Sequence, residues 1–161
     1  MLTTTALVLT ADQVSKALIL TARPQTGAGW INVRLLRNTG ANGGIGASYP
    51  LLVTLVAIAI GCVAGVVAMR VRSRGIALCL AAVVGGALGN LSDRLFRAPG
   101  FGRGGVVDWI HLRLMSGSFN VADLAIQIGV LGTIIGLLDG ERAHKAGQPT
   151  QNASAGEQRA L

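Results

Sequence analysis

Three features of the sequence predict an all-α membrane protein with four transmembrane helices and a small extracytoplasmic β-element. The 161-residue chain is 51% apolar and has a mean hydropathy of +0.56, whereas only 13% of its residues are charged. Four apolar runs approach the roughly 20 residues that a helix needs to cross a bilayer. A short alternation of apolar and polar residues between the first two runs indicates a surface strand. A soluble globular domain needs more surface charge than this composition offers.

The four apolar runs cover about residues 2–20, 51–69, 76–95 and 119–138. Together they predict one membrane domain over residues 1–138. The first run has no basic segment before it, and Asp12 and Lys16 interrupt it, so we expect a retained helix rather than a secretory signal. Residues 139–161 are polar and lack apolar periodicity, which predicts a disordered cytoplasmic tail.

Basic residues in the short loops predict the orientation. Arg70, Arg72 and Arg74 crowd the turn between the second and third runs, and Arg142 and Lys145 follow the fourth. Lys and Arg in short loops mark the cytoplasmic side of a membrane. We therefore expect both termini in the cytoplasm and the two longer connections on the outer face.

The two longer connections differ in character. In the first, residues 30–35 alternate apolar and polar side chains, which predicts a short strand on the membrane surface. In the second, one proline and four glycines between residues 99 and 105 predict a flexible turn before the run Val-Val-Asp-Trp-Ile at 106–110.

Composition and spacing argue against several classes of partner. The net charge of +7 does not form a continuous basic stripe, so we expect no nucleic-acid partner. Cys62 and Cys79 lie inside apolar runs and are interpreted as small hydrophobic residues. His111 and His144 have no Glu or Cys partner at metal-ligand spacing, so we expect neither a metal nor a cofactor.

The acidic residues are the most informative feature. Of seven in total, Asp12, Asp93, Asp108 and Asp123 lie in or beside apolar sequence. A charged group at the bilayer centre costs about 2.5 to 3.5 kcal/mol, so each is by default a candidate functional residue. At 1.5 Å per residue, Asp12 lies about 15 Å along its run, Asp93 about 26 Å and Asp123 about 6 Å below its outer end. We therefore expect the four carboxylates to gather toward the outer face.

Carboxylates held a few ångströms apart share a proton, so that one can activate a water molecule while the other donates a proton. A purely structural role, as a helix cap or a paired polar residue, remains open for each of these aspartates. Asp12 and Lys16 can neutralise each other at i, i+4. Asp93 can pair with Arg94 or with a residue that faces it, and Asp123 can cap the fourth helix beside Asn120. A small proton- or cation-handling transporter or channel subunit is the alternative function, and a non-enzymatic scaffold is a third.

Five short stretches, in this order, resemble the sequence blocks of the lipoprotein signal peptidase (signal peptidase II) family. They are Asp-Gln-Val-Ser-Lys at 12–16, Asn-Thr-Gly-Ala at 38–41, Gly-Gly-Ala-Leu-Gly-Asn-Leu-Ser-Asp-Arg-Leu at 85–95, Val-Val-Asp-Trp-Ile at 106–110 and Phe-Asn-Val-Ala-Asp at 119–123. The family usually places an aromatic residue after the second block, whereas here Asn-Gly-Gly-Ile-Gly follows at 42–46.

The resemblance implies an aspartic endopeptidase with Asp108 and Asp123 as catalytic residues. The implied substrate is a prolipoprotein with diacylglycerol on the cysteine that follows its signal peptide, cleaved just before that cysteine. The implied location is the bacterial cell (inner) membrane, where the chain contacts membrane lipid and is taken as a monomer. Seven further residues match positions that bind substrate or support the site: Asn90, Asp93, Arg94, Asn120, Asn38, Asp12 and Lys16.

Residue spacing is consistent with these roles. Asn90, Asp93 and Arg94 are spaced i, i+3 and i+4, so they project from one face of a helix. Gly85 and Gly89 repeat at four residues beside that face, which permits close contact with another helix.

Overall fold

The computed structural model describes residues 1–24, 30–41, 44–114 and 117–146. In this part of the chain the elements are four helices and a small sheet. The helices are α1 (Leu2–Ala22), α2 (Pro50–Arg70), α3 (Arg74–Phe96) and α4 (Val121–Ala146). The strands are β1 (Ile31–Asn38), β2 (Val106–Leu112) and β3 (Ser118–Phe119).

Three of the four helices, within the residues that the structure describes, are long and apolar enough to cross a membrane. They are α2, α3 and the segment Val121–Arg142 of α4, which confirms three of the predicted spans. Helix α1 covers the first predicted span but carries the buried charges of Asp12 and Lys16, and its status as a span stays a prediction.

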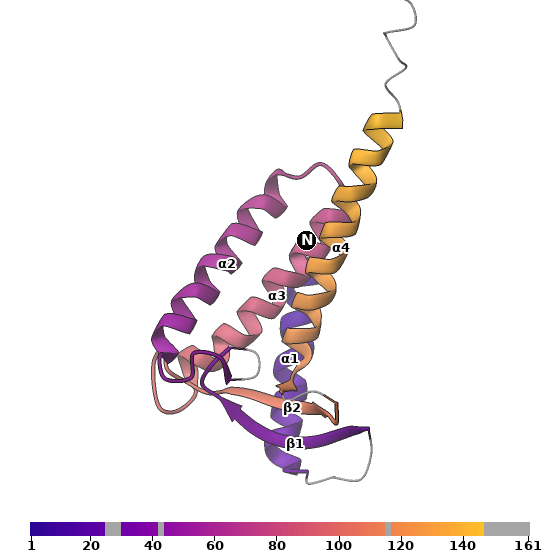
Figure 1. The fold of residues 1–161 in the computed structure, drawn as a ribbon. Coiled ribbons are helices and arrows are strands. Elements are labelled where there is room, and N and C mark those ends of the chain that lie inside the picture. The colour runs from indigo at the N-terminus through magenta and orange to yellow at the C-terminus, as the bar shows by residue number, and fades with distance from the viewer. Residues whose placement is uncertain (25–29, 42–43, 115–116, 147–161) are drawn as a thin grey trace, which may run out of the picture.

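Helix α3 is the centre of the bundle and packs against each of the other three helices. Figure 1 shows α2 and α4 on either side of α3, with α1 behind. The N-terminus, the turn between α2 and α3 and the end of α4 lie at one end of the bundle, and the sheet lies at the other. Gly85 permits the close contact between α3 and α1 that its spacing predicts, because a Cβ added to Gly85 would lie 2.8 Å from the Thr5 carbonyl oxygen.

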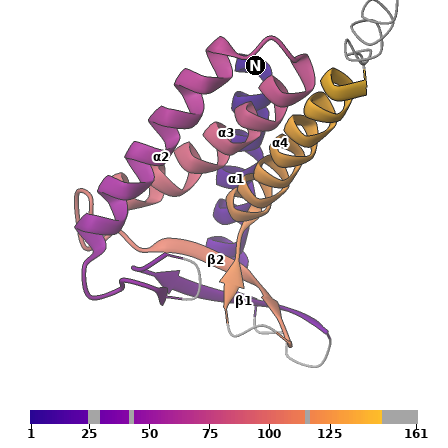
Figure 2. The ribbon, with the colours of Figure 1, turned by 45° about the horizontal axis from the view of Figure 1, so that its top comes forward.

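The sheet is antiparallel, in the order β1-β2-β3. Asn38 pairs with Val106 at one end of the β1–β2 ladder, and Ile31 pairs with Leu112 at the other. The predicted strand at 30–35 is thus confirmed and extends to Asn38, because the second connection supplies its partner. Figure 2 shows β1 and β2 crossing below the ends of α1 and α4.

Two predicted boundaries are wrong. Phe119 was expected to begin the fourth span, but it belongs to β3 and pairs with Ile110, so the helix begins at Val121. The predicted disordered tail begins too early, because α4 continues through residues 139–146 to Ala146. Residues 147–161 lie outside the described part of the chain.

Candidate active site

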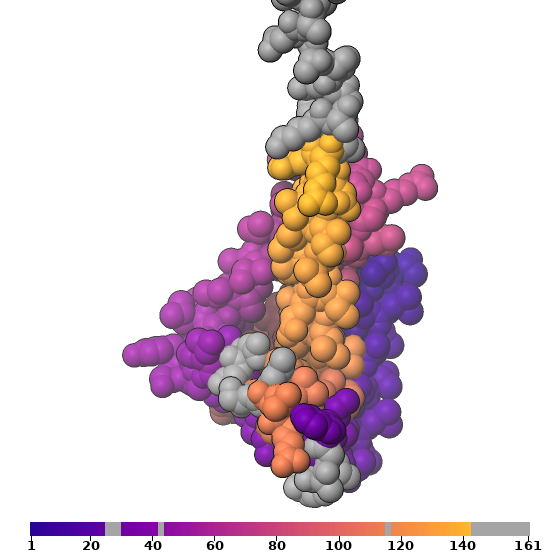
Figure 3. Space-filling model, turned by 45° about the vertical axis from the view of Figure 1, so that its right-hand side comes forward, coloured from indigo at the N-terminus to yellow at the C-terminus, as the bar shows by residue number. Residues whose placement is uncertain are grey.

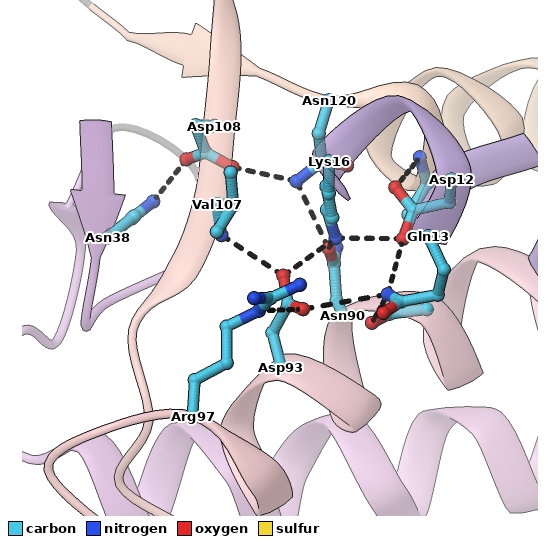
Figure 4. Close-up of polar contacts among 12 residues, drawn as sticks. Asp12, Gln13, Lys16, Asn38, Asn90, Asp93, Arg97, Val107, Asp108 and Asn120 are labelled. Atoms are coloured by element: carbon cyan, nitrogen blue, oxygen red, sulfur yellow. Dashed lines mark hydrogen bonds and ion pairs between the residues drawn. The ribbon is translucent and has the colours of Figure 1, made fainter. Parts of the chain in front are cut away.

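A buried ion cluster joins α1 to α3 at the sheet end of the bundle. The Lys16 ammonium lies 2.8 Å from Asp12 Oδ2 and 2.9 Å from Asp93 Oδ2, and none of the three side chains is exposed. Asp93 also pairs with Arg97 through its other carboxylate oxygen, and its Oδ2 accepts the backbone N–H of Val107 at 3.0 Å. Figure 4 shows Lys16 at the centre of these contacts. Because buried charges need partners, this network fixes α1, α3 and β2 relative to one another.

Asp12 has a second role at the start of α4. Its Oδ1 accepts the backbone N–H of Ala122 at 3.0 Å, while its Oδ2 faces Lys16. The first amides of a helix have no partner within the helix and carry partial positive charge, so a carboxylate stabilises them. The predicted neutralisation of Asp12 by Lys16 is confirmed, and Asp12 also joins α1 to α4.

Asn120 and Asp123 cap α4 reciprocally. The backbone N–H of Asp123 donates to Asn120 Oδ1 at 2.9 Å, and the backbone N–H of Asn120 donates to Asp123 Oδ2 at 3.2 Å. This is the capping-box arrangement, in which each side chain satisfies the amide of the other residue. The capping interpretation is therefore confirmed, and it coexists with further contacts of both side chains.

The cap determines which way the Asn120 amide faces. Because Oδ1 accepts from a backbone amide that can only donate, Nδ2 must point the other way. There it donates to Asp108 Oδ1 at 2.7 Å and to Asn90 Oδ1 at 3.1 Å. Asn90 in turn donates through Nδ2 to Asp123 Oδ1 at 2.8 Å. The two carboxylates are thus joined through a short chain of oriented amides.

A third asparagine holds the other oxygen of Asp108. Asn38 accepts the backbone N–H of Gly40 at 2.9 Å through Oδ1, which directs its Nδ2 to Asp108 Oδ2 at 3.0 Å. Asp108 lies between Asn38 and Asn120 in Figure 4. Both of its oxygens therefore accept a side-chain amide, one from Asn38 at the end of β1, 70 positions away, and one from Asn120, just before α4.

Burial, followed by the neighbouring charge of Asp123, raises the pKa of Asp108 from its ordinary value of 3.8 to about 6. The hydrogen bonds from Asn38 and Asn120 act in the opposite direction but are weaker. Desolvation penalises the ionised form of a carboxyl, and a second carboxylate nearby adds repulsion. Asp108 is thus poised to gain or lose a proton near neutral pH.

Asp108 and Asp123 line the same cavity, which has a volume of about 230 Å³. Asn38, Asn90 and Arg94 contribute further polar groups to its wall, while Val53, Val56, Ala57 and Ile60 of α2 are among its apolar lining residues. Two carboxyl groups at one apolar-walled cavity can hold a water molecule and a peptide group between them.

Arg94 has a different partner from the one that its position predicts. Its guanidinium donates to the backbone carbonyls of Thr39 at 3.2 Å and Gly40 at 2.6 Å. Of the two partners expected for Asp93, Arg94 is therefore wrong, whereas a facing residue is confirmed, because Lys16 of α1 pairs with Asp93 together with Arg97. Arg94 instead holds the segment after β1 against the cavity, and the two residues share only their place on one face of α3.

The structure brings together all nine residues that the sequence singled out, and it adds two. Gln13 donates through Nε2 to Asp12 Oδ2 and to the Gly89 carbonyl, at 3.1 Å in both cases. Arg97 pairs with Asp93. Each had a signal in the sequence, since Gln13 follows Asp12 directly and Arg97 lies at i+4 from Asp93. No three His, Cys, Asp or Glu side chains in the described ranges form a group that could hold a metal ion.

The fold and the site define a helical membrane protein whose buried carboxylates are covered at one end by a small sheet. Two solved structures, each described as a bacterial membrane enzyme, share this fold. One is 25% identical with a TM-score of 0.76 and covers 93% of both chains. The other is 25% identical with a TM-score of 0.68 and covers 85% of this chain and 91% of that chain.

Residues 4–139 match the family described as signal peptidase (SPase) II. A lipoprotein signal peptidase of Leifsonia xyli subsp. xyli is 36% identical over 153 residues, which cover 89% of this chain and 71% of that protein. A lipoprotein signal peptidase of Streptomyces griseus subsp. griseus is 42% identical over 106 residues, which cover 66% of this chain. The matched segment is 54% of that protein, so the chain spans about half of its length. The chain belongs to the signal peptidase II family.

Proposed function

We propose that this chain is an aspartic endopeptidase of the bacterial membrane that removes signal peptides from diacylglyceryl-modified prolipoproteins. The observation that carries the proposal is that Asp108 and Asp123 line one cavity and are joined through the Asn120 and Asn90 amides. Membership of the signal peptidase II family supports the substrate class. Cleavage falls just before the lipidated cysteine.

In the proposed reaction a water molecule lies between the two carboxyl groups. One carboxylate takes a proton from the water molecule as the water oxygen attacks the scissile carbonyl carbon. The other carboxyl donates its proton to the nitrogen as the C–N bond breaks, so the pair ends with the same number of protons. No covalent intermediate with the protein and no metal are needed. The pKa of about 6 for Asp108 supports proton exchange at neutral pH.

The route for substrate is an apolar groove of about 430 Å³ between α2 and α4. It is lined by Val63, Val67, Val130 and Ile134 among others. Ile60 and Val83 line both this groove and the cavity at the carboxylates, so the two are contiguous. Figure 3 shows α2 and α4 diverging with a hollow between them. A signal-peptide helix that moves laterally in the bilayer can enter here and present its outer end to the aspartates.

The same proposal gives the chain its topology. Helix α1 crosses the membrane as a fourth span, and residues 1–138 form one peptidase domain. Both termini face the cytoplasm, since Arg70, Arg72 and Arg74 lie at the end of the bundle opposite the sheet. The carboxylates then lie near the outer face. The protein acts as a monomer in contact with membrane lipid, without a cofactor.

The distribution of carboxylates favours a peptidase over a transporter. A proton or cation path needs acidic groups spread across the bilayer. Asp12, Asp93, Asp108 and Asp123 instead contact one connected network at the sheet end of the bundle. Carboxylates that gather at one end of the bundle favour a catalytic site over a proton or cation path across the membrane.

The test is a cleavage assay in lipid-containing detergent micelles with a diacylglyceryl prolipoprotein and its unmodified form. The protein releases the signal peptide from the modified substrate, and Asp108→Asn and Asp123→Asn abolish release. Asp139→Asn is the matched control, because this exposed aspartate lies beyond the groove on α4 and pairs with Arg142 at the helix surface. Full cleavage by both site variants would exclude the aspartate pair.

A further inference from the structure

Lys16 has no exposed surface and uses all of its hydrogen-bonding capacity. Its ammonium carries three protons and has three acceptors, namely Asp12 Oδ2 at 2.8 Å, Asp93 Oδ2 at 2.9 Å and Asn90 Oδ1 at 3.1 Å. The first two contacts neutralise charge. The third leads out of the ion cluster toward the cavity and is not needed for neutralisation.

The contact with Asn90 has a consequence for the carboxyl pair. An ammonium can only donate, so the Asn90 oxygen must face Lys16 and its NH2 group must face Asp123. Asn120 Nδ2 donates to the same Asn90 oxygen and supports this orientation. Lys16 thus acts on Asp123 through Asn90 without touching it.

The cluster around Lys16 is electrically balanced. The formal charges of Asp12, Asp93, Lys16 and Arg97 sum to zero, which makes burial of Lys16 tolerable. Lys16 is the member whose ammonium also contacts the amide chain. Its positive charge lowers the pKa of Asp108, which is in line with a position close to the carboxyl pair.

We propose that Lys16 is a positioning residue of the peptidase. Lys16 orients the Asn90 side chain so that the Asn90 NH2 group donates to Asp123, and the Lys16 charge acts on the carboxyl pair from α1. This inference rests on the proposed function. It extends that function from the two carboxyl groups to a cation on a different helix, which contacts neither of them.

A pH profile can detect this role because the groups that face Asp108 are known. They are Lys16 from α1, Arg94 from α3, Asp123 from α4, Asn120 just before α4 and Asn38 from β1. Removal of the Lys16 charge leaves the other four in place. The midpoint of the pH–rate profile that reports Asp108 must then move to higher pH, whichever proton transfer it reflects.

The experiment compares Lys16→Met with the double variant Asp12→Asn/Lys16→Met in the cleavage assay. The double variant removes one negative and one positive charge, so the remaining cluster stays balanced. We expect both variants to lower kcat by about tenfold to a hundredfold with little change in KM. We also expect the profile midpoint to rise by about 0.5 to 1 pH unit in both. In an Asn90→Ala background, Lys16→Met is expected to lower kcat much less, because the two residues act in one chain.

A double variant with the wild-type kcat and pH profile would show that Lys16 only neutralises the carboxylates, and would overturn the proposal. Failure of both variants to fold, judged by gel filtration and circular dichroism, would assign Lys16 to folding and overturn it as well. Failure of the wild-type protein to cleave the lipidated substrate would instead refute the proposed function itself.

Discussion

Replacement of Asp108 by asparagine is expected to remove activity and, at the same time, to change how stability depends on pH. The native pKa of this carboxyl is about 6, compared with an ordinary value of 3.8, and burial is the main cause. A carboxyl whose pKa is raised by folding favours the native state below the unfolded pKa and loses this contribution as the pH rises through the native pKa. One pKa unit equals about 1.4 kcal/mol, so the loss between pH 4 and pH 7 is about 2.5 kcal/mol.

Asparagine cannot ionise, so the variant does not suffer this loss. Its NH2 group meets the amide donors of Asn38 or Asn120, which costs about 1 to 3 kcal/mol. That cost is independent of pH, so it does not affect the change in unfolding free energy of the variant between two pH values. The unfolding free energy of the variant relative to wild type is therefore expected to increase by about 2.5 kcal/mol from pH 4 to pH 7.

The assay is reversible SDS or thermal unfolding in lipid-containing micelles at several pH values between 4 and 8. Asp139→Asn serves as the control, because its side chain is 66% exposed. Parallel stability curves for wild type and Asp108→Asn across this range would refute the reasoning, since they would mean that the native carboxyl titrates as it does in water.

Three further predictions concern the amides, the arginine and a glycine. Asn120→Ser keeps a capping oxygen and is expected to retain stability while kcat falls by about tenfold to a hundredfold. Asn120→Ala is expected to lose about 1 kcal/mol of unfolding free energy as well. Equal kcat values for Asn120→Ser and the wild type would contradict this. Arg94→Lys keeps the charge but not the two-pronged contact with the segment after β1, so KM is expected to rise by about tenfold with a smaller change in kcat, and an unchanged KM in a substrate titration would argue against it. Gly89→Ala is expected to destabilise strongly because the added Cβ would lie 2.5 Å from Asp12 Oδ2, whereas Gly65→Ala, with its nearest neighbour at 3.9 Å, is expected to stabilise by about 0.5 to 1 kcal/mol in the same unfolding assay.

Several features of the fold and site follow from local sequence alone. The apolar runs of α2, α3 and α4 predict helices because an apolar segment of this length can satisfy its backbone in a bilayer only within itself. The strand at 30–35 follows from the alternation of apolar and polar side chains, which has the two-residue period of a strand. The placement of Asp12, Asp93, Asp108 and Asp123 in apolar sequence marked them as candidates, because such positions are unfavourable for a charge without a role.

The tertiary structure decided which partner each polar group takes. The sequence left Arg94 or an unspecified facing residue as the partner of Asp93. The structure selects Lys16, which is 77 positions away, together with Arg97. Arg94 instead donates to the Thr39 and Gly40 carbonyls. Phe119 joined a strand rather than a helix because Ile110 was available to pair with it. Hydrophobic periodicity depends on residues within a few turns of one another and can be read along the chain. Buried ion pairs and amide orientations depend on groups that only the packing of α1, α3, α4 and the sheet brings within 3 Å or so, and on the requirement that every donor there finds an acceptor.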